Sequence, residues 1–556
     1  MSPLVLLWLA VVPAEAPIDT AVVCPSEFRA ALAPWIAYRE AQGHRMVVLT
    51  NRESAGDLRA TIRRTAEKHP LKYLVLVGDA QPITAREAPQ TTRSNSSGPA
   101  ASKTSPKNSN EVTAARSNTV PTHHAQAVVN VRWGSEPLIA TDNWYADLDD
   151  DRVPELAVGR LTADTPAELE AMVAKILAYE QCDDYGGWRR RVNFIAGLGG
   201  FGPVADAVLE AAAKTLITSG VPPAYATTMT YSSWQSPYCP DPRDFGRVTL
   251  ERLNEGSLFW VYIGHGQERS LDVVQVPGGA YPILACRDTL RLACRHGAPI
   301  ACFLACYAGA FDKPQDCLAE ELLRAPGGPV AIVAGTRVTM PYAMATLGTE
   351  LLRECFENNP PTIGAAIVAA KRRTMQPAGD SQQRVALDAL GKTFNSAGDL
   401  EAERAEHLDL FHLFGDPLMR LPQPRPIQLE VRSTAAAGQS LQVRGTSPVS
   451  GACTIELVVR RDRLTFQPQP RSRFDSSALA AYDATYRKAN EPRLATVTLD
   501  RVEGTFDATL TVPPEARGAC HVRVFVEGLE ACAAGAADVR LEGSATARRE
   551  GEQRPQ

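Results

Sequence analysis

The sequence predicts two fold types in succession: a mostly parallel α/β sheet flanked by helices, and then an all-β sandwich. Between residues 20 and 77, short apolar runs alternate with amphipathic helical patterns, as in a parallel sheet covered on both faces. Residues 422–426 read PQPRP, a stiff linker. Seven short apolar segments with turn signals between them follow. This pattern is typical of an immunoglobulin-like sandwich, here over residues 427–542.

The composition is that of a soluble globular protein, with 556 residues of which 44% are hydrophobic and 22% charged. A chain of this length exceeds a single hydrophobic core, so two or three domains are expected. The net charge of −5 and the scattered Lys and Arg residues argue against a nucleic-acid partner. No apolar run after residue 20 is long enough for a stable membrane span.

Residues 1–16 resemble a secretory signal peptide. An apolar run precedes Ala14-Glu15-Ala16, which fits a small-residue cleavage site, although no basic residue comes before the run. A first strand or a misassigned start codon would also account for this segment. Because the first strand of the fold is expected from Ala21, we expect an exported protein, extracellular or periplasmic. Three cysteines near the C-terminus are candidates for one disulfide in an exported protein: Cys453, Cys520 and Cys532.

The first part of the α/β region reads as strand, helix, strand, helix, strand. The strands are the apolar runs AVVCP, RMVVL and YLVLVGD, and the segments between them have helical spacing. Residues 89–125 then have no apolar period and are rich in Ser, Thr, Asn and Pro, which predicts a disordered surface insertion. We expect His123 and His124, at the end of this insertion, to be solvated. The charged residues 543–556 are expected to form a disordered tail.

Five aspartates lie within ten residues: Asp142, Asp147, Asp149, Asp150 and Asp151. Oxygen-rich acidic loops suit Ca²⁺, which takes six to eight oxygen ligands. The spacing is not that of an EF-hand, so a solvated acidic loop is the alternative to a calcium site. The next helix is expected from Pro166 to Tyr179, with Asp164 or Thr165 as its cap.

Two apolar strands in the middle of the chain each end in a reactive side chain. The run SLFWVYIGHG ends at His265 between two glycines, and APIACFLACYAGAFD contains Cys306. Open α/β sheets bind ligands at the carboxyl ends of their strands, where a cysteine and a histidine form a nucleophile and its base. The alternative is two core strands, because free cysteine is often a small buried hydrophobe. After the next buried strand, Thr336–Tyr342 are expected to wall the cleft, whereas His407 and His412 are expected to be structural.

These segments resemble the catalytic segments of the gingipain family, bacterial cysteine peptidases with a caspase-like fold. In that family one strand ends in Gly-His-Gly, here residues 264–266, and a later strand ends in Ala-Cys before a small-residue turn and Phe, here residues 305–311. A helix that opens at a second cysteine, here Cys317, follows. Three more segments are similar and occur in the same order: KYLVLVGDAQPI, DNWYADLDDDRVPELAVGRL and HLFGDPLMR. The resemblance covers residues 20–422, the expected catalytic domain.

The resemblance implies an exported cysteine endopeptidase that acts on protein or peptide substrates through a thioester. Cys306 is then the nucleophile and His265 the general base and acid. The backbone N–H groups of Gly266 and Cys306 are the expected oxyanion donors. Cys302 is the rival nucleophile, but burial in the apolar run would raise its pKa. The chemistry requires no cofactor, and family members bind calcium, which favours a structural calcium ion at the acidic loop.

The sequence departs from the gingipain pattern at the residue that orients the catalytic histidine. An acidic residue can occupy the glycine turn after RRVNFIAG, where this chain has Leu198. The third member of the triad is therefore unassigned, and a backbone carbonyl or a carboxylate from elsewhere could hold the ring. Asp206 and Glu210 do not match the family spacing of the acidic residue in the substrate pocket. Two functions compete with peptide hydrolysis: a catalytically silent protein- or surface-binding module, and a transpeptidase.

Overall fold

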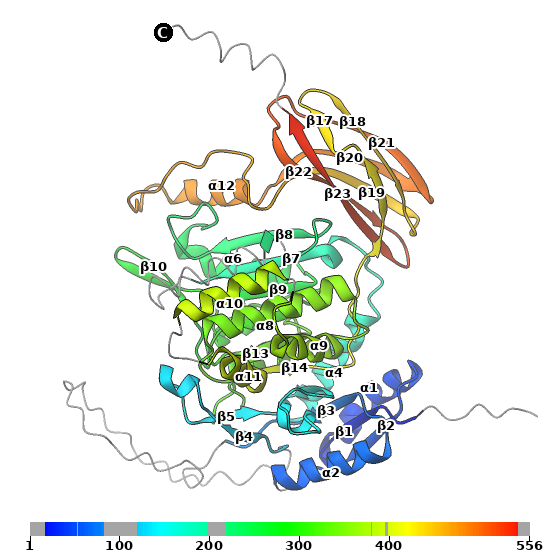
Figure 1. The fold of residues 1–556 in the computed structure, drawn as a ribbon, viewed down its shortest axis with the longest axis vertical. Helices are drawn as coiled ribbons and strands as arrows, with labels where there is room; N and C mark the ends of the chain where they lie inside the picture. The colour runs from blue at the N-terminus through cyan, green and yellow to red at the C-terminus, as the bar shows by residue number, and fades with distance from the viewer. Residues whose placement is uncertain are drawn as a thin grey trace, which may run out of the picture.

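A ten-stranded sheet forms the centre of the α/β region (Figure 1). The computed structural model describes residues 17–52, 54–82, 119–197, 217–218, 220–379, 381–394 and 399–542. Within these residues the strand order is β2-β1-β3-β6-β14-β13-β12-β9-β7-β8. Every neighbouring pair runs parallel except β13 and β14, which are antiparallel. The predicted mostly parallel α/β sheet is therefore confirmed.

The sheet consists of two sets of strands joined by one late strand. The first set comprises β1 (Thr20–Val23), β2 (Met46–Leu49), β3 (Tyr73–Val77) and β6 (Ala157–Leu161). The second comprises β7 (Arg191–Ala196), β8 (Ala226–Tyr231), β9 (Phe259–Ile263), β12 (Ile300–Leu304) and β13 (Ala331–Gly335). Strand β14 (Phe411–Phe414) lies between β6 and β13. The sequence prediction did not include this strand.

Both faces of the sheet are covered, as alternate residues of a single strand show. In β3, Val75 and Val77 belong to the large core that includes residues of α1 and α4. Leu74 and Leu76 belong to a separate cluster that includes residues of α2 and α3. The helices of this region are α1 (Arg29–Ala41), α2 (Ala55–Lys68), α3 (Asn143–Ala146), α4 (Pro166–Glu180), α6 (Phe245–Asn254), α7 (Leu318–Arg324), α8 (Pro341–Arg353), α9 (Ile363–Met375), α10 (Gln382–Phe394) and α11 (Leu400–Leu410).

Helix α4 begins at the cap that its sequence predicts. The Thr165 hydroxyl accepts the N–H of Glu168, and the Glu168 side chain accepts the N–H of Thr165. Pro166 occupies the first helical position, where a proline removes no helical hydrogen bond. The reciprocal pair is a capping box, which satisfies two N–H groups that the helix leaves unpaired.

The turn after β14 connects the end of the α/β region to its first helix. Asp416 Oδ2 accepts hydrogen bonds from Trp35 Nε1 at 2.5 Å and Arg39 Nε at 3.0 Å. Its Oδ1 accepts the N–H of Leu418 at 2.8 Å. The side chains of Trp35, Arg39 and Asp416 are fully buried. The aspartate of the FGDP segment therefore holds together parts of the chain almost 400 residues apart, with a sequence separation of 381 between Trp35 and Asp416.

We expect Asp416→Ala to lower the free energy of unfolding by about 3–5 kcal/mol, because it leaves the buried Arg39 without one of its two carboxylate partners. Urea unfolding followed by circular dichroism measures this change. Glu251→Ala is the matched control, since it removes an exposed ion pair with Arg247 and should change stability by less than about 0.5 kcal/mol. Equal effects of the two substitutions would contradict the assigned role of Asp416.

Residues 119–126 are ordered, so the predicted disordered insertion is wrong at its C-terminal end; residues 89–118 lie outside the described part of the chain. Strand β4 (His123–Gln126) pairs with β5 (Leu138–Thr141). His123 stacks on Trp144 with ring centroids 3.9 Å apart, and burial lowers its pKa to about 4. His124 Nε2 lies 3.1 Å from Asp312 Oδ2. The prediction of two solvated histidines is also wrong, because both rings have packed partners.

The seven predicted strands of the C-terminal sandwich are all present. One sheet contains β19 (Gly451–Val459), β20 (Arg493–Val502), β22 (Gly518–Glu527) and β23 (Cys532–Glu542), together with the short β15 (Arg425–Pro426) and β17 (Thr434–Ala436). The other contains β16 (Gln428–Val431), β18 (Ser440–Thr446) and β21 (Thr505–Thr511). Their apolar faces form a core separate from that of the α/β region. All twelve cysteines are free thiols, including the three predicted candidates for a disulfide.

Helix α12 (Leu479–Ala489) and the residue after it join the sandwich to the large sheet. The Asn490 amide accepts the N–H of Met229 at 2.7 Å and donates to its carbonyl at 2.9 Å. Met229 belongs to β8, the edge strand, so the Asn490 side chain pairs backbone groups that an edge strand would otherwise expose. Thr230 and Tyr486 hydrogen-bond beside this contact at 2.8 Å.

Candidate active site

His265 and Cys306 lie just beyond the carboxyl ends of two neighbouring parallel strands. Strands β9 and β12 pair with Ile263 opposite Leu304, and the N–H of Gly264 donates to the carbonyl of Leu304 at 3.2 Å. Each reactive residue follows two positions after its strand ends. The sheet therefore brings the predicted histidine and cysteine segments to the same edge.

The two glycines around His265 permit this close approach. A Cβ atom on Gly266 would lie 2.4 Å from the carbonyl oxygen of Cys306. At Gly264, where φ is +157°, a Cβ atom would lie 2.7 Å from Tyr262 Oη. A side chain at Gly266 would collide with the backbone of Cys306, so glycine is required for the contact between the two segments, whereas a side chain at Gly264 would collide with Tyr262 and Gly197.

The Cys306 side chain is half-buried, and its sulfur contacts Thr339. The N–H of Thr339 donates to Cys306 Sγ at 3.3 Å, and Thr339 Oγ1 lies 3.5 Å from the same sulfur. An N–H donor stabilises a thiolate more than a neutral thiol. The segment 336–342 was predicted to wall the cleft, but the sequence did not single out Thr339. This residue belongs to the loop between β13 and α8.

The backbone directly after Cys306 makes a tight turn. The N–H of Ala308 donates to the carbonyl of Cys306 at 2.7 Å, and Tyr307 adopts a φ of 56°, which is rare for an aromatic residue. Tyr307 is held at its far end, where its hydroxyl donates to Glu136 at 2.7 Å. The turn places Cys306 outside the strand, whereas its neighbours Ala308 and Ala310 are buried.

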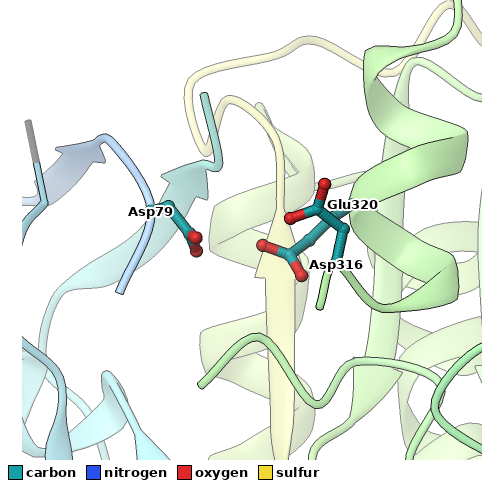
Figure 2. Close-up of side chains that lie close together, drawn as sticks. All are labelled: Asp79, Asp316 and Glu320. Carbon is teal, nitrogen blue, oxygen red and sulfur yellow. The ribbon is translucent and has the colours of Figure 1, made fainter. Parts of the chain in front are cut away.

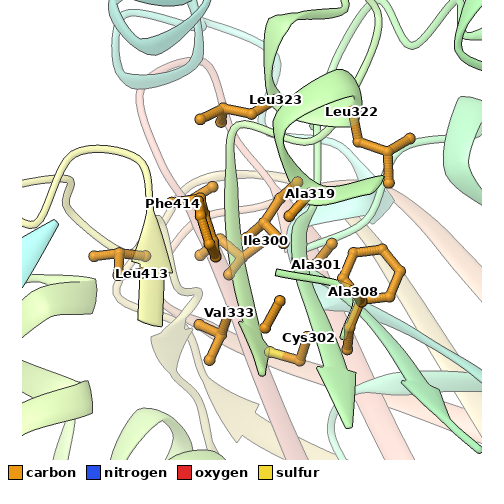
Figure 3. Close-up of a cluster of buried hydrophobic side chains, with 14 of the residues drawn as sticks. Ile300, Ala301, Cys302, Ala308, Ala319, Leu322, Leu323, Val333, Leu413 and Phe414 are labelled. Atoms are coloured by element: carbon orange, nitrogen blue, oxygen red, sulfur yellow. The ribbon is translucent and has the colours of Figure 1, made fainter. Parts of the chain in front are cut away.

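Cys302, the rival nucleophile, is enclosed within β12. It lies beside Val333 of the neighbouring strand, in a cluster of buried apolar side chains (Figure 3). Burial raises the pKa of its thiol to about 12. A thiol with so high a pKa is almost entirely protonated at neutral pH, so this environment does not suit a nucleophile.

A charged network supports the other side of the Cys306 turn. Arg337 donates to Asp312 at 2.8 Å, and His124 also contacts this carboxylate. Burial would raise the pKa of Asp312, but the hydrogen bonds from His124 and Arg337 outweigh it and hold the pKa well below its usual value. The network links β4 to the turn after β12. The sequence prediction missed it because its members are distant along the chain.

The predicted acidic loop divides into two environments. Asp142 is fully buried and pairs with Arg160 at 2.7 Å, so it belongs to the core and not to the loop. Oxygen atoms of three loop carboxylates lie within 4.8 Å of one another: Asp147, Asp149 and Glu155. The sequence prediction did not include Glu155. The charges of Asp149 and Asp147 both raise the pKa of Glu155, in addition to the larger effect of burial.

A second group of carboxylates joins two of the family-like segments (Figure 2). Asp79 follows β3, and Asp316 and Glu320 lie at the start of α7. Burial raises the pKa of Asp79 to about 6, and burial together with the charge of Asp79 raises that of Glu320. Arg324 lies 2.6 Å from Asp316 and 3.9 Å from Glu320. These contacts balance the charges within the protein, and we therefore interpret the group as structural.

His407 and His412 are both buried, in agreement with the structural roles predicted for them. Each ring hydrogen-bonds a backbone carbonyl of its own segment at 2.8 Å, and burial lowers both pKa values to about 4.

Three other residues from the sequence analysis lie outside the described part of the chain: Leu198, Asp206 and Glu210. Among the described residues, no helix is both long enough and apolar enough to cross a membrane.

Comparison with known proteins identifies the family of this chain. The model of peptidase family C25 matches residues 13–422. Lys-gingipain HG66 of Porphyromonas gingivalis is 22% identical over 430 residues, which cover 72% of this chain and 20% of that protein. Another Lys-gingipain of the same species is 22% identical over 322 residues, or 55% of this chain and 15% of that protein. The chain therefore spans at most about a fifth of the length of these curated relatives.

Solved structures agree on the fold. The crystal structure of the Arg-specific cysteine proteinase gingipain R aligns with a TM-score of 0.50 and 16% identity, covering 94% of this chain and 98% of that one. At this identity the alignment establishes the fold alone. Because the family model matches most of the sequence and the fold is that of gingipain R, this protein belongs to peptidase family C25, the gingipain family of cysteine peptidases.

Proposed function

We propose that the protein hydrolyses peptide bonds, with Cys306 as the nucleophile and His265 as the general base and acid. The observation that carries this proposal is the contact between the two strand ends, where Gly266 packs against the Cys306 backbone with no room for a side chain. Membership of a cysteine peptidase family supports it. The half-buried Cys306 with its Thr339 N–H donor suits a reactive thiolate better than the enclosed Cys302 does.

In the first half of the reaction, the Cys306 thiol gives its proton to His265, and the sulfur attacks the carbonyl carbon of the substrate. The resulting tetrahedral intermediate carries a negative oxygen, which the N–H groups of Gly266 and Cys306 would stabilise. A short hairpin begins at Gly266, which lies opposite Leu271 in an antiparallel pair. The hydrogen bond next to this pair runs from the N–H of Gln267 to the carbonyl of Ser270. Gly266 and Leu271 therefore form a non-hydrogen-bonded pair. In such a pair the N–H points away from the partner strand and is available to a ligand.

In the second half, protonated His265 gives its proton to the leaving amine, and a thioester remains on Cys306. Water then attacks the thioester as His265 takes one of its protons. Breakdown of the second tetrahedral intermediate releases the carboxylic acid and regenerates the thiol. If an amine takes the place of water, the same thioester yields a transpeptidation product.

Incubation of the purified full chain with a denatured protein, followed by mass spectrometry of the products, tests the proposed function. We expect new peptide ends in the wild type and none in Cys306→Ala. Relatives named as Lys-gingipain and as an Arg-specific proteinase make basic residues before the cut the first substrates to try, next to neutral ones. An added amine that appears in the products would identify transfer. No cleavage by folded protein would favour the alternative of a silent binding module.

We also propose export, because residues 1–16 have the pattern of a signal peptide; they lie outside the described residues.

For the acidic loop we propose a structural calcium ion. The carboxylates of Asp147, Asp149 and Glu155 offer oxygen ligands close together, which suits such a hard cation. The residues would hold the ion in the loop before β6 and take no part in the reaction.

We expect calcium to raise the melting temperature of the protein by about 3 °C or more relative to a sample treated with chelator, since a ligand that binds only the folded state stabilises it. Differential scanning fluorimetry measures the shift. Asp149→Asn should abolish most of it, whereas Asp151→Asn, whose carboxylate accepts the N–H of Val153 in the same loop, should retain it. An identical response of both variants to calcium would exclude this site.

A further inference from the structure

Beyond Gly266 the chain forms a short hairpin that returns to the catalytic histidine. The N–H of Gln267 donates to the carbonyl of Ser270 at 2.8 Å, and Gly266 is bridged to Leu271 in an antiparallel pair. One step further from the turn, the same register places Asp272 opposite His265. Opposite residues of an antiparallel pair project to the same face, with Cβ atoms about 4.5–5.5 Å apart. The hairpin thus sets a carboxylate beside the imidazole.

The buried Tyr262 fixes the backbone of both residues. Its hydroxyl donates to the carbonyl of His265 at 2.7 Å and accepts the N–H of Asp272 at 3.4 Å. Tyr262 belongs to β9 and is fully buried, so this bridge is anchored in the central sheet. Asp272 is therefore held in place by the same strand that positions His265.

The carboxylate of Asp272 also lies close to Gly197, the residue that precedes Leu198 in the chain. Its Oδ2 would be 3.4 Å from a Cβ atom on Gly197. Gly197 directly follows β7 and precedes Leu198, the position that can hold an acidic residue in the gingipain pattern. The other oxygen, Oδ1, accepts the N–H of Val273 at 2.7 Å, which limits rotation of the carboxylate.

The electrostatics of Asp272 include the histidine. Burial raises the pKa of Asp272, while the hydrogen bond from Val273 and the positive charge of His265 act in the opposite direction. Among the described residues, the Tyr262 phenol and the Cys306 thiol also face this cluster. Burial raises the pKa of Tyr262, and the charges of Asp272 and Cys306 raise it further. The phenol is therefore neutral at physiological pH.

We propose that Asp272 is the positioning residue that orients the imidazole of His265, in place of an acidic residue at position 198. The inference rests on the proposed function. In the reaction, Cys306 gives its proton to one nitrogen of His265, while Asp272 accepts a hydrogen bond from the other N–H and remains ionised. It thereby selects the tautomer that can take the proton and stabilises the imidazolium that forms.

Kinetics of Asp272→Asn across pH 5–9 test the proposal. We expect kcat for a peptide substrate to fall by about 100-fold or more, with KM within about threefold of the wild type, because the substituted residue does not touch the substrate. In Asp272→Asn the rate of Cys306 alkylation by iodoacetamide should fall at low pH, because the thiolate–imidazolium pair is weakened. Asp272→Glu keeps the carboxylate and should recover much of kcat. If Asp272 had only a structural role, restoring the carboxylate would not restore kcat.

Two further variants are compared with Asp272→Asn. Glu268→Gln removes an exposed carboxylate from the tip of the same hairpin and should leave kcat and the alkylation profile unchanged. Asp206→Asn tests the competing carboxylate on the chain that follows Leu198. Full activity and an unaltered pH profile in Asp272→Asn, or loss in Asp206→Asn alone, would overturn the inference while the proposed function stands. A wild type that neither cleaves peptides nor reacts at Cys306 would instead refute the proposed function.

Discussion

Cys306→Ala is expected to lower kcat/KM for a peptide substrate by about 10⁵-fold or more, because no other group can form the thioester. The folded state should persist, since the side chain is half-buried in a turn and its removal opens no large cavity in the core. Rates of peptide hydrolysis and the melting temperature of the same preparation measure both effects.

Cys302→Ala is the matched control for this substitution. It removes the same atom type four residues earlier, from the buried core of β12, and should cost about 1 kcal/mol of stability with activity retained. If Cys302→Ala were the inactive variant and Cys306→Ala the active one, the assignment of the nucleophile would be wrong.

His265→Ala is expected to lower kcat by roughly 10³- to 10⁴-fold, because the thiol loses the base that takes its proton and the leaving amine loses its acid. Alkylation of Cys306 should then follow the ionisation of an isolated thiol and become slow below neutral pH. His296→Ala changes an exposed histidine away from the β9 and β12 strand ends and should behave as the wild type. Unchanged kcat in His265→Ala would remove His265 from the mechanism.

The apolar runs around residues 258–311, together with their resemblance to the gingipain segments, predicted the central part of the site. Buried strands that end at a glycine or a small residue place their next side chains at the sheet edge, and this local rule is independent of the rest of the fold. It was therefore possible to predict His265, Gly266 and Cys306 as neighbours. The sandwich was predictable for a similar reason, because each strand alternates apolar and polar residues between clear turn signals.

Elements that depend on distant partners were not predicted. Strand β14 has only four residues and directly follows α11, so its sequence resembles a continuation of the helix. Helix α12 lies in a polar stretch and buries one narrow face that includes Leu479, Tyr482 and Tyr486. Its stability depends on packing more than on its own composition.

The role proposed for Asp272 was hidden because the hairpin that delivers it has no recognisable turn signal. The residues between Gln267 and Ser270 are Glu and Arg, whereas tight hairpins usually contain Asn-Gly or Asp-Gly. The distance of seven residues from His265 becomes meaningful only when the register is known. The Cys306–Thr339 contact was similarly hidden, because it joins loops that follow two different strands.

Covalent labelling tests the central claim most directly. A peptide carrying a thiol-reactive group at its C-terminal end would be offered to the folded full chain, with Arg, Lys or a neutral residue next to that group, and the modified residue located by mass spectrometry after digestion. We predict a single adduct on Cys306, formed much more slowly in His265→Ala and absent in Cys306→Ala. Labelling of another cysteine, or labelling at the same rate in His265→Ala, would contradict a catalytic Cys306–His265 pair.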